Sequence, residues 1–166
     1  RKPRRSMGRV SQLATRASEL ALADAGLISD PVLTSGRAGV SYGSSTGATD
    51  SIRDFGHMFH SKSTDGIGGN TYIRMMPHTT AVSIGMFFRM TGRILPSSTA
   101  CTSGSLSIGL AYEAIKFGFQ DVMVAGGSEE LCVSEATVFD TLYATSTCND
   151  RPDRSPRPFD ADRDGL

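Results

Sequence analysis

The sequence predicts an α/β fold in which a parallel or mixed β-sheet is covered by helices on both faces. The prediction rests on an alternation that runs through most of the 166 residues. Short apolar runs alternate with longer segments whose apolar residues recur every three or four positions. Such a pattern places crossover helices over a sheet, and this length is sufficient for one domain with an apolar core.

The first half of the chain is expected to supply two helices and one strand. Residues 6–25 are predicted to be helical because their apolar residues share one face, and Gly26 ends the pattern. The run AGVSYG at 38–43 indicates a strand, and a second helix is expected near 49–60. Residues 61–70, SKSTDGIGGN, indicate a loop.

The second half repeats the alternation. Pro77 suits the first turn of a helix that runs to about Met90. The elements expected after it are a strand in RILPSSTA (93–100), a helix at 103–117, a strand in QDVMVAGG (120–127) and a helix at 131–145. The tail from residue 146 is rich in Asp, Arg and Pro and is expected to be an ordered loop.

Composition narrows the classes of function. The 17 Lys and Arg residues balance the 17 Asp and Glu residues, so the charge gives no reason to expect a nucleic-acid partner. No apolar stretch approaches the ~20 residues that cross a bilayer, and no signal peptide is visible, so we expect no membrane partner. The three cysteines form no CxxC pair, which favours a reducing, cytoplasmic location over a disulfide scaffold.

Cys101 lies where an apolar run ends and a helical pattern begins, in SSTACTSGSLSIG (97–109). A strand–cysteine–helix junction puts the thiol at the carboxyl edge of a sheet, where α/β proteins bind ligands. The same junction puts it at a helix N-terminus, where N–H groups and the dipole stabilise a thiolate and can hold an oxyanion. Thr102 and Ser103 are small enough to let a bulky substrate approach. A buried packing role is the alternative, because free cysteines are often buried.

Other candidate motifs are weaker. His57 and His60 form an HxxH pair, but the sequence indicates no Asp or Glu as a third metal ligand, so we expect a surface helix and no metal site. The glycine-rich stretches GSSTG and GIGG lack the GK[ST] sequence of a phosphate loop. The stretch SLSIG lacks the first glycine of GxSxG, which disfavours a serine hydrolase.

Four segments resemble, in family order, the β-ketoacyl-acyl-carrier-protein synthases, the condensing enzymes of fatty acid and polyketide synthesis. STACTSGSLSIG resembles their nucleophile motif, and GVSYGSSTG (39–47) resembles the strand and turn near their acyl pocket. DVMVAGGSEE (121–130) resembles the strand after the nucleophile helix, and ATSTCNDRPDRSPRPFDADRDG (144–165) resembles a loop ending in RPxDxxRDG. The resemblance implies a thiolase-like layered α/β sandwich that works as a homodimer.

The resemblance also implies a reaction and its residues. Cys101 would accept an acyl chain from the phosphopantetheine of an acyl carrier protein, and its own backbone N–H would be one oxyanion donor. A malonyl-derived enolate would then attack the acyl-enzyme, with no metal and no further cofactor. The residues implied to contact the acyl substrate are Thr46, Tyr72, Met75, Met76, Thr102 and Ser103. The basic residues implied to dock the carrier are Arg1, Lys2, Arg4 and Arg5.

The match further implies how much of a synthase is present. The catalytic histidines and the lysine of the family follow the RDG motif, and neither His57, His60 nor His78 lies in a matching context. Residues 1–166 are therefore expected to be part of the N-terminal synthase domain, without the first strand and the C-terminal half. On their own they are expected to be inactive and to associate.

Two alternatives remain open. One is a non-catalytic scaffold subunit of a condensing heterodimer, which the presence of Cys101 disfavours. The other is a thiolase acting on coenzyme A esters, which the RPFDADRDG ending disfavours.

Overall fold

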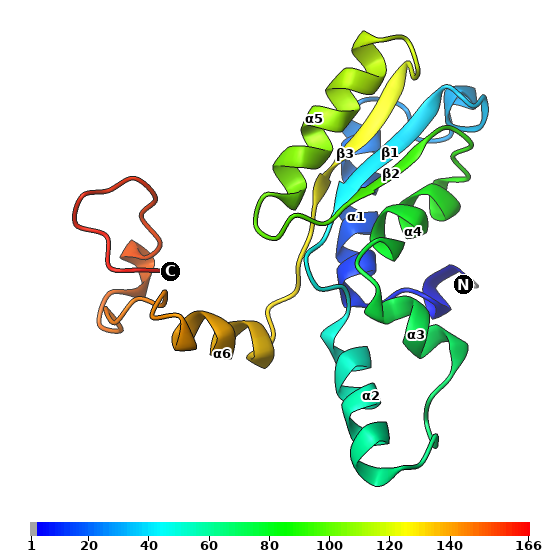
Figure 1. Ribbon diagram of the computed structural model, residues 1–166. Coiled ribbons are helices and arrows are strands. Elements are labelled where there is room, and N and C mark those ends of the chain that lie inside the picture. Colours follow the sequence, from blue (N-terminus) through cyan, green and yellow to red (C-terminus); the bar gives the residue numbers. More distant parts are fainter. Residues whose placement is uncertain (1–2) are drawn as a thin grey trace. The chain divides into compact units, whose positions relative to one another are not determined.

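The structure is a computed structural model that describes residues 3–166, with side chains from Arg4 onward (Figure 1). The chain divides into two compact units, Arg1–Glu130 and Leu131–Leu166. The first unit contains the sheet, the helices that cover it and Cys101. No helix within residues 3–166 is long and apolar enough to cross a membrane.

A three-stranded parallel sheet forms the centre of the first unit. Its strands are β1 (Ala38–Gly43), β2 (Ile94–Ser97) and β3 (Val122–Gly127), in the order β2-β1-β3. Strand β1 pairs with both neighbours, so that Val40 lies opposite Ile94 on one side and Val124 on the other. Every residue of β1 is buried, as expected for the central strand of a sheet covered on both faces.

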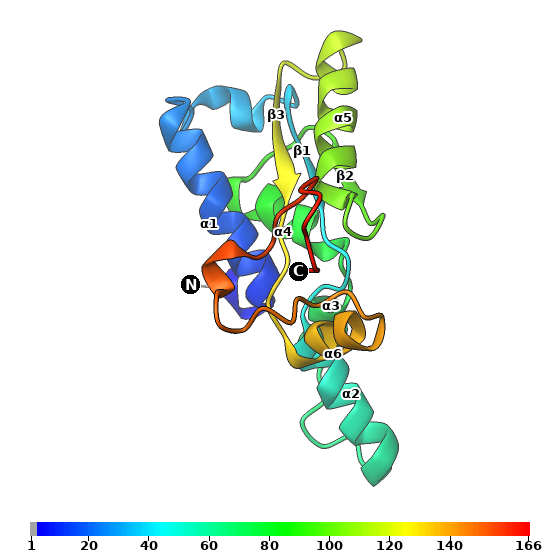
Figure 2. The same cartoon turned by 90° about the vertical axis from the view of Figure 1, so that its left-hand side faces the viewer.

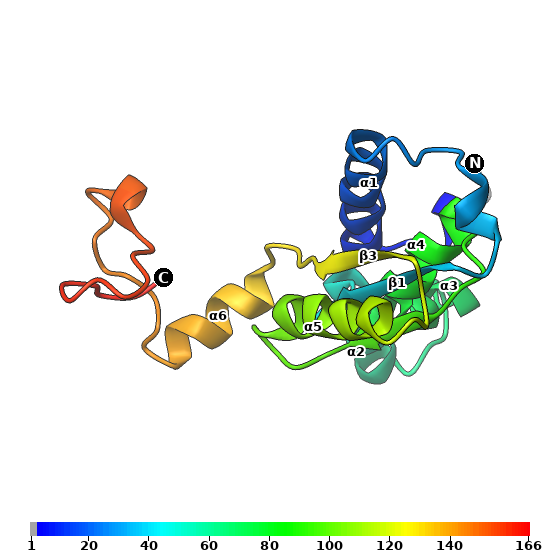
Figure 3. The same ribbon diagram turned by 90° about the horizontal axis from the view of Figure 1, so that it is seen from above.

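Helices cover both faces of this sheet, as the alternating pattern predicted. Helices α1 (Arg9–Asp24) and α4 (Thr79–Phe88) lie over one face, and α5 (Ser103–Lys116) lies over the other (Figures 2 and 3). The main apolar core is on the α1 and α4 side. It includes Ala14, Leu22, Ala38, Val40, Tyr42, Ala81 and Ile84.

Helix α5 approaches the sheet through small residues. Its buried positions are Ser103, Ser107, Ala111 and Ala114. The opposite side of the helix is apolar yet exposed, at Leu106, Ile108, Tyr112 and Ile115. Helix α5 therefore packs a face of small residues on the sheet and leaves an apolar face exposed.

Helices α2 (Thr49–Ser61) and α3 (Gly69–Met75) follow β1 and contact each other beyond the carboxyl edge of the sheet (Figure 1). The sequence analysis predicted α2 but not α3, because residues 61–70 were expected to be loop and no element was expected at 71–76. Helix α4 begins at Thr79 rather than at Pro77. The Thr79 hydroxyl donates to the carbonyls of Ile73 (3.0 Å) and Met76 (2.7 Å), which fixes a turn between α3 and α4.

The first predicted helix is shorter than expected. A 3₁₀ turn, Pro3–Arg5, precedes it, and α1 begins only at Arg9. A second 3₁₀ turn, Pro31–Thr34, lies between α1 and β1, and Asp30 caps it by accepting from the Val32 N–H (2.8 Å). Arg4 and Arg5 therefore lie in the first 3₁₀ turn, before α1, as they lay before the predicted helix.

The second unit consists of α6 (Val133–Thr141), a 3₁₀ turn at Pro152–Arg154 and the loop around them. Helix α6 is shorter than the predicted 131–145, and none of its residues is buried. Asp164 orders the loop, because its carboxylate accepts from the Ser146 hydroxyl (2.7 Å) and the Thr147 N–H (3.1 Å). These contacts hold the pKa of Asp164 down at about 2.

Candidate active site at the carboxyl edge of the sheet

Cys101 lies in the short turn that joins β2 to α5. Strand β2 ends at Ser97 and α5 begins at Ser103, so the thiol lies beside the first turn of the helix. Cys101 is exposed, which contradicts the buried packing alternative. The preceding residue, Ala100, has a left-handed backbone with φ of 51°, a conformation that costs energy for a residue with a side chain. The turn is thus a strained elbow that presents the cysteine.

Buried hydroxyl groups hold this elbow in place. The Ser103 hydroxyl donates to the Ala100 carbonyl (2.6 Å) and accepts from the Thr99 N–H (2.8 Å). The Ser97 hydroxyl donates to the Ser103 carbonyl (2.8 Å) and lies 2.8 Å from the Ser107 hydroxyl. Because these groups are buried, each hydrogen bond is costly to lose, and together they fix the position of the cysteine.

The two small residues after the cysteine differ in their surroundings. Thr102 is exposed, and its hydroxyl donates to the Thr99 carbonyl (2.8 Å). Ser103, which was expected to contact substrate, is buried with 4% of its surface exposed. Its hydroxyl is engaged in the elbow, so in this structure Ser103 supports Cys101. The N–H of Cys101 donates to no acceptor among the described residues.

Strand β1 touches the elbow through Gly43. A methyl group at that position would lie 2.6 Å from the Ser103 carbonyl oxygen and 2.7 Å from the Ser103 Cβ. Glycine is therefore required for β1 to approach the start of α5 this closely. The contact places the turn after β1 next to the nucleophile.

The turn after β1 wraps around a carboxylate from the segment that follows β3. Glu129 accepts hydrogen bonds from the Ser44 hydroxyl (2.8 Å), the Ser45 N–H (2.5 Å), the Thr46 hydroxyl (3.1 Å) and the Thr46 N–H (3.4 Å). Thr46 was expected to face the acyl pocket, and in the structure its hydroxyl is bonded to Glu129. The sequence analysis did not single out Glu129.

Glu130 has a related structural role at the next element. Its carboxylate accepts from the N–H and the hydroxyl of Thr49, at 2.7 and 2.6 Å, and thereby caps the first turn of α2. A carboxylate at this place also interacts favourably with the helix dipole. Glu130 is buried, with 6% of its surface exposed.

The same turn also contacts the segment that contains Tyr72, Met75 and Met76, which were expected to contact the acyl substrate. Gly47 has φ of 69°, and a methyl group there would lie 2.6 Å from the Met75 carbonyl oxygen. The Ala48 N–H donates to the Arg74 carbonyl (3.0 Å). The structure thus brings Thr46 close to the Met75–Met76 segment, whose side chains are half-buried. Tyr72, also predicted to contact substrate, lies on α3 with 54% of its surface exposed.

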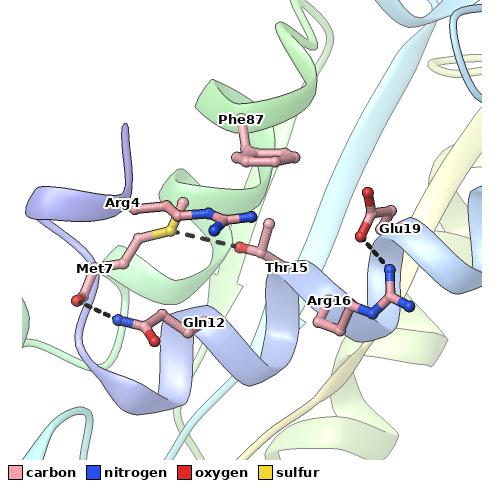
Figure 4. Close-up of a pocket in the computed structure, with 7 residues that line it drawn as sticks. All are labelled: Arg4, Met7, Gln12, Thr15, Arg16, Glu19 and Phe87. Atoms are coloured by element: carbon pink, nitrogen blue, oxygen red, sulfur yellow. Dashed lines mark hydrogen bonds and ion pairs between the residues drawn. The ribbon is translucent and has the colours of Figure 1, made fainter. Parts of the chain in front are cut away.

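The predicted carrier-docking residues are only partly described. Arg1 and Lys2 lie outside the described residues. Arg4 and Arg5 are exposed in the 3₁₀ turn before α1, and the Arg5 carbonyl accepts from the Arg74 guanidinium. Arg4 also lines a small cavity between this turn, α1 and α4 (Figure 4), together with Met7, Gln12, Thr15, Arg16, Glu19 and Phe87.

The remaining histidines and cysteines do not gather into a second site. His57 and His60 are exposed on α2, and His78 is exposed before α4. Within residues 3–166, no group of three or more His, Cys, Asp or Glu side chains could hold a metal ion. Cys132 caps α6 by accepting from the Glu135 N–H (3.4 Å). A hydrogen bond with the Asp164 carboxylate raises the pKa of the Cys148 thiol, which disfavours its reactive form.

The arrangement around Cys101 is suited to covalent catalysis by a thiol. The sulfur is exposed beside a helix N-terminus, and among the described residues the N–H of the same residue has no acceptor, so it can meet a developing oxyanion. The fixed elbow supplies the positioning that such chemistry requires.

Comparison with known proteins agrees with this geometry. The family described as "Beta-ketoacyl synthase, N-terminal domain" matches residues 1–166. The chain is 34% identical over 169 residues to 3-oxoacyl-[acyl-carrier-protein] synthase 1 of Escherichia coli (strain K12), with 100% of this chain and 41% of the relative covered. It is 32% identical over 167 residues to the actinorhodin polyketide putative beta-ketoacyl synthase 1 of Streptomyces coelicolor, with 96% and 36% covered.

Solved structures agree as well. The chain matches a beta-ketoacyl synthase from Burkholderia phymatum with a TM-score of 0.93 and 58% identity, over 100% of this chain and 41% of that one. It matches the ishigamide ketosynthase/chain length factor with a TM-score of 0.82 and 26% identity, over 97% and 39%. The fold is thus the N-terminal part of the thiolase-like ketosynthase fold, and the chain spans about two fifths of the relatives it matches. Since the family match covers the whole chain, residues 1–166 belong to the β-ketoacyl synthase family of condensing enzymes.

Proposed function

We propose that the protein containing this chain is a 3-oxoacyl-[acyl-carrier-protein] synthase and that Cys101 is its acyl acceptor. The observation that carries the proposal is the exposed thiol held in a strained, hydrogen-bonded elbow at the start of α5. The names of relatives such as the Escherichia coli synthase support the choice of reaction. The presence of the thiol favours a catalytic subunit over a scaffold subunit.

In the first half-reaction, the Cys101 thiolate attacks the carbonyl carbon of an acyl thioester. The negative charge that develops on the carbonyl oxygen meets the Cys101 N–H. The carbon–sulfur bond to the carrier's phosphopantetheine then breaks, and the released thiolate takes a proton. The acyl chain remains on the sulfur of Cys101 as a new thioester, which carbon nucleophiles attack readily.

In the second half-reaction, malonyl-carrier loses CO2 and the resulting enolate attacks the acyl carbonyl. A carbon–carbon bond forms, the bond to the Cys101 sulfur breaks, and a 3-oxoacyl-carrier leaves. Residues 3–166 offer no histidine close in sequence to the elbow for holding the enolate charge. We assign that task to the part of the protein that corresponds to the remaining three fifths of its relatives, and we expect residues 1–166 alone to form no product.

The proposed partner is an acyl carrier protein, and the proposed assembly is a homodimer in the cytoplasm. Arg4 and Arg5 support carrier docking because both are exposed before α1, where their charges lie free of carboxylate partners among the described residues. No metal or further cofactor is proposed, because the acyl groups arrive on the phosphopantetheine of the carrier. The apolar outer face of α5 supports a further layer packed against that helix.

The proposal is tested by mass spectrometry on the full-length protein. An acyl-carrier donor should add one acyl group to Cys101, and the Cys101→Ala variant should accept none. Cys132→Ala and Cys148→Ala are the matched controls and should be acylated like the wild type. Acylation that persists in Cys101→Ala would overturn the nucleophile assignment, and acylation from coenzyme A esters alone would identify a thiolase instead.

Carrier docking has its own test. Charge reversal at Arg4 and Arg5 in the full-length protein should raise KM for the acyl-carrier donor about tenfold or more, because each reversal replaces an attraction with a repulsion. The rate with a small acyl thioester should not change. An unchanged KM for the carrier-bound donor would refute docking at these residues.

A further inference from the structure

The carboxylate of Glu129 lies in a nest formed by the turn after β1. Two successive backbone N–H groups, from Ser45 and Thr46, point at it, and the hydroxyls of Ser44 and Thr46 complete the set. Successive N–H groups of this kind form an anion-binding concavity. Among the described residues, Glu129 forms no ion pair with Lys, Arg or His. Its charge is therefore balanced by hydrogen bonds from this turn.

The turn connects Glu129 to both sides of the candidate site. On one side, β1 ends at Gly43 against Ser103 in the cysteine elbow. On the other side, Gly47 packs on the Met75 carbonyl, and the Ala48 N–H bonds to the Arg74 carbonyl. A displacement of the turn would therefore move Thr46 and the Met75–Met76 segment relative to Cys101.

A carboxylate is needed at this position because its donors approach from two directions. One oxygen, Oε1, accepts from the Ser44 hydroxyl and from Thr46, while Oε2 accepts from the Ser45 N–H at 2.5 Å. A glutamine can offer one oxygen only. Its NH₂ group would face the backbone N–H of either Ser45 or Thr46, and these two donors repel each other.

We propose that Glu129 is a positioning residue that sets which acyl chain lengths reach Cys101. It acts by holding the Thr46 turn, which contacts both the cysteine elbow through Gly43 and the Met75–Met76 segment through Gly47. The inference rests on the proposed function, since it assumes that an acyl chain enters next to Cys101. It assigns to Glu129 no contact with the reacting atoms.

The test uses the full-length protein and two acyl-carrier donors, one with a short and one with a long acyl chain. The rate of Cys101 acylation is measured for each donor by mass spectrometry, and the long-to-short ratio is the readout. In Glu129→Gln the ratio should change about tenfold, the size expected when a charge-assisted hydrogen bond is replaced by a clash. Glu19→Gln, which removes a carboxylate from an exposed pair on α1, is the matched control and should leave the ratio unchanged.

A second variant shows whether Glu129 acts through the turn. Thr46→Val keeps the shape of the side chain but removes the hydroxyl that donates to Glu129. It should shift the ratio in the same direction, and the double variant should shift it by less than the product of the two single effects. Thr46→Val carries the test by itself if Glu129→Gln does not fold.

The outcomes separate this inference from the proposed function. If the wild type is not acylated at Cys101, the proposed function fails. If the wild type is acylated but Glu129→Gln and Thr46→Val leave the ratio unchanged, the proposed function stands and the positioning role is overturned. Equal losses with both donors, accompanied by a lower Tm, would show a merely structural role and would also overturn it.

Discussion

Replacing Gly43 with alanine should disturb the cysteine elbow through the contact between β1 and α5. The added methyl group would lie 2.6 Å from the Ser103 carbonyl oxygen and 2.7 Å from the Ser103 carbonyl carbon and Cβ. None of these atoms belongs to the far end of a flexible side chain. Since ordinary contact begins at 3.4 Å, β1 and the start of α5 must separate by about 0.8 Å.

This separation has two measurable consequences. Overpacking of a rigid contact costs about 1–3 kcal/mol of folding free energy. The displacement also reaches Cys101, because Ser103 bonds to both Ala100 and Thr99 in the turn. A shift near 1 Å in a catalytic group can lower a rate about 100-fold, so we expect acylation of Cys101 to fall by about 10–100-fold.

The assay compares Tm and the rate of Cys101 acylation in the full-length protein. Gly56→Ala is the control, because a methyl group at that position of α2 meets no atom within 4 Å and alanine favours a helix. The control should match or slightly exceed the wild type in Tm. A Gly43→Ala protein with wild-type Tm and wild-type acylation would show that this close approach does not position the nucleophile.

Three further predictions concern the carboxylates. Glu130→Leu should lower the free energy of unfolding, measured with urea, by about 1–3 kcal/mol, because the N–H and hydroxyl of Thr49 lose their buried acceptor. An unchanged free energy of unfolding would show that Glu130 does not stabilise the start of α2. Asp164→Asn should lower the pH midpoint of Cys148 alkylation, monitored by mass spectrometry, because Asp164 raises the pKa of that thiol. An unchanged midpoint would show that Asp164 does not affect the Cys148 thiol. The pKa of Asp164 is depressed to about 2, so the ionised carboxylate stabilises the 144–166 loop at pH values above the ordinary carboxyl pKa. This stabilisation should be lost as the pH falls toward 2. The Thr147 N–H, which bonds to Asp164, should lose protection from hydrogen exchange over that range, and full protection below it would contradict the assignment.

The elements with a strong local pattern could be predicted from the sequence. Strand β1 was predicted at its observed bounds because it is a short run of apolar and small residues. Helix α5 was predicted to within one residue at each end because its small and apolar residues recur every three or four positions. Helix α3 was missed because seven residues are too few for a helical period to stand out, and glycines precede it. Its hydrogen bond to Thr79 and its contact with α2 stabilise it instead.

In the candidate site, too, some features could be predicted from local sequence and others could not. The position of Cys101 at the end of a strand and the start of a helix followed from the order of residues along the chain. The burial of Ser103 did not, since the residue type suits either a surface or a hydroxyl network. The start of α1 at Arg9, three residues later than predicted, did not follow from the local pattern either.

The alternation of strands and helices and the junction that carries Cys101 could be predicted from sequence, because both depend on neighbours within a few residues. The roles of Glu129 and Glu130 depend on tertiary contacts. Their hydrogen-bond partners lie 81 to 85 positions away in the sequence, in the segment that follows β1. The parallel pairing of β1 with β3 ends both strands at the same edge, and this pairing alone brings the carboxylates to the turn and the helix that they hold.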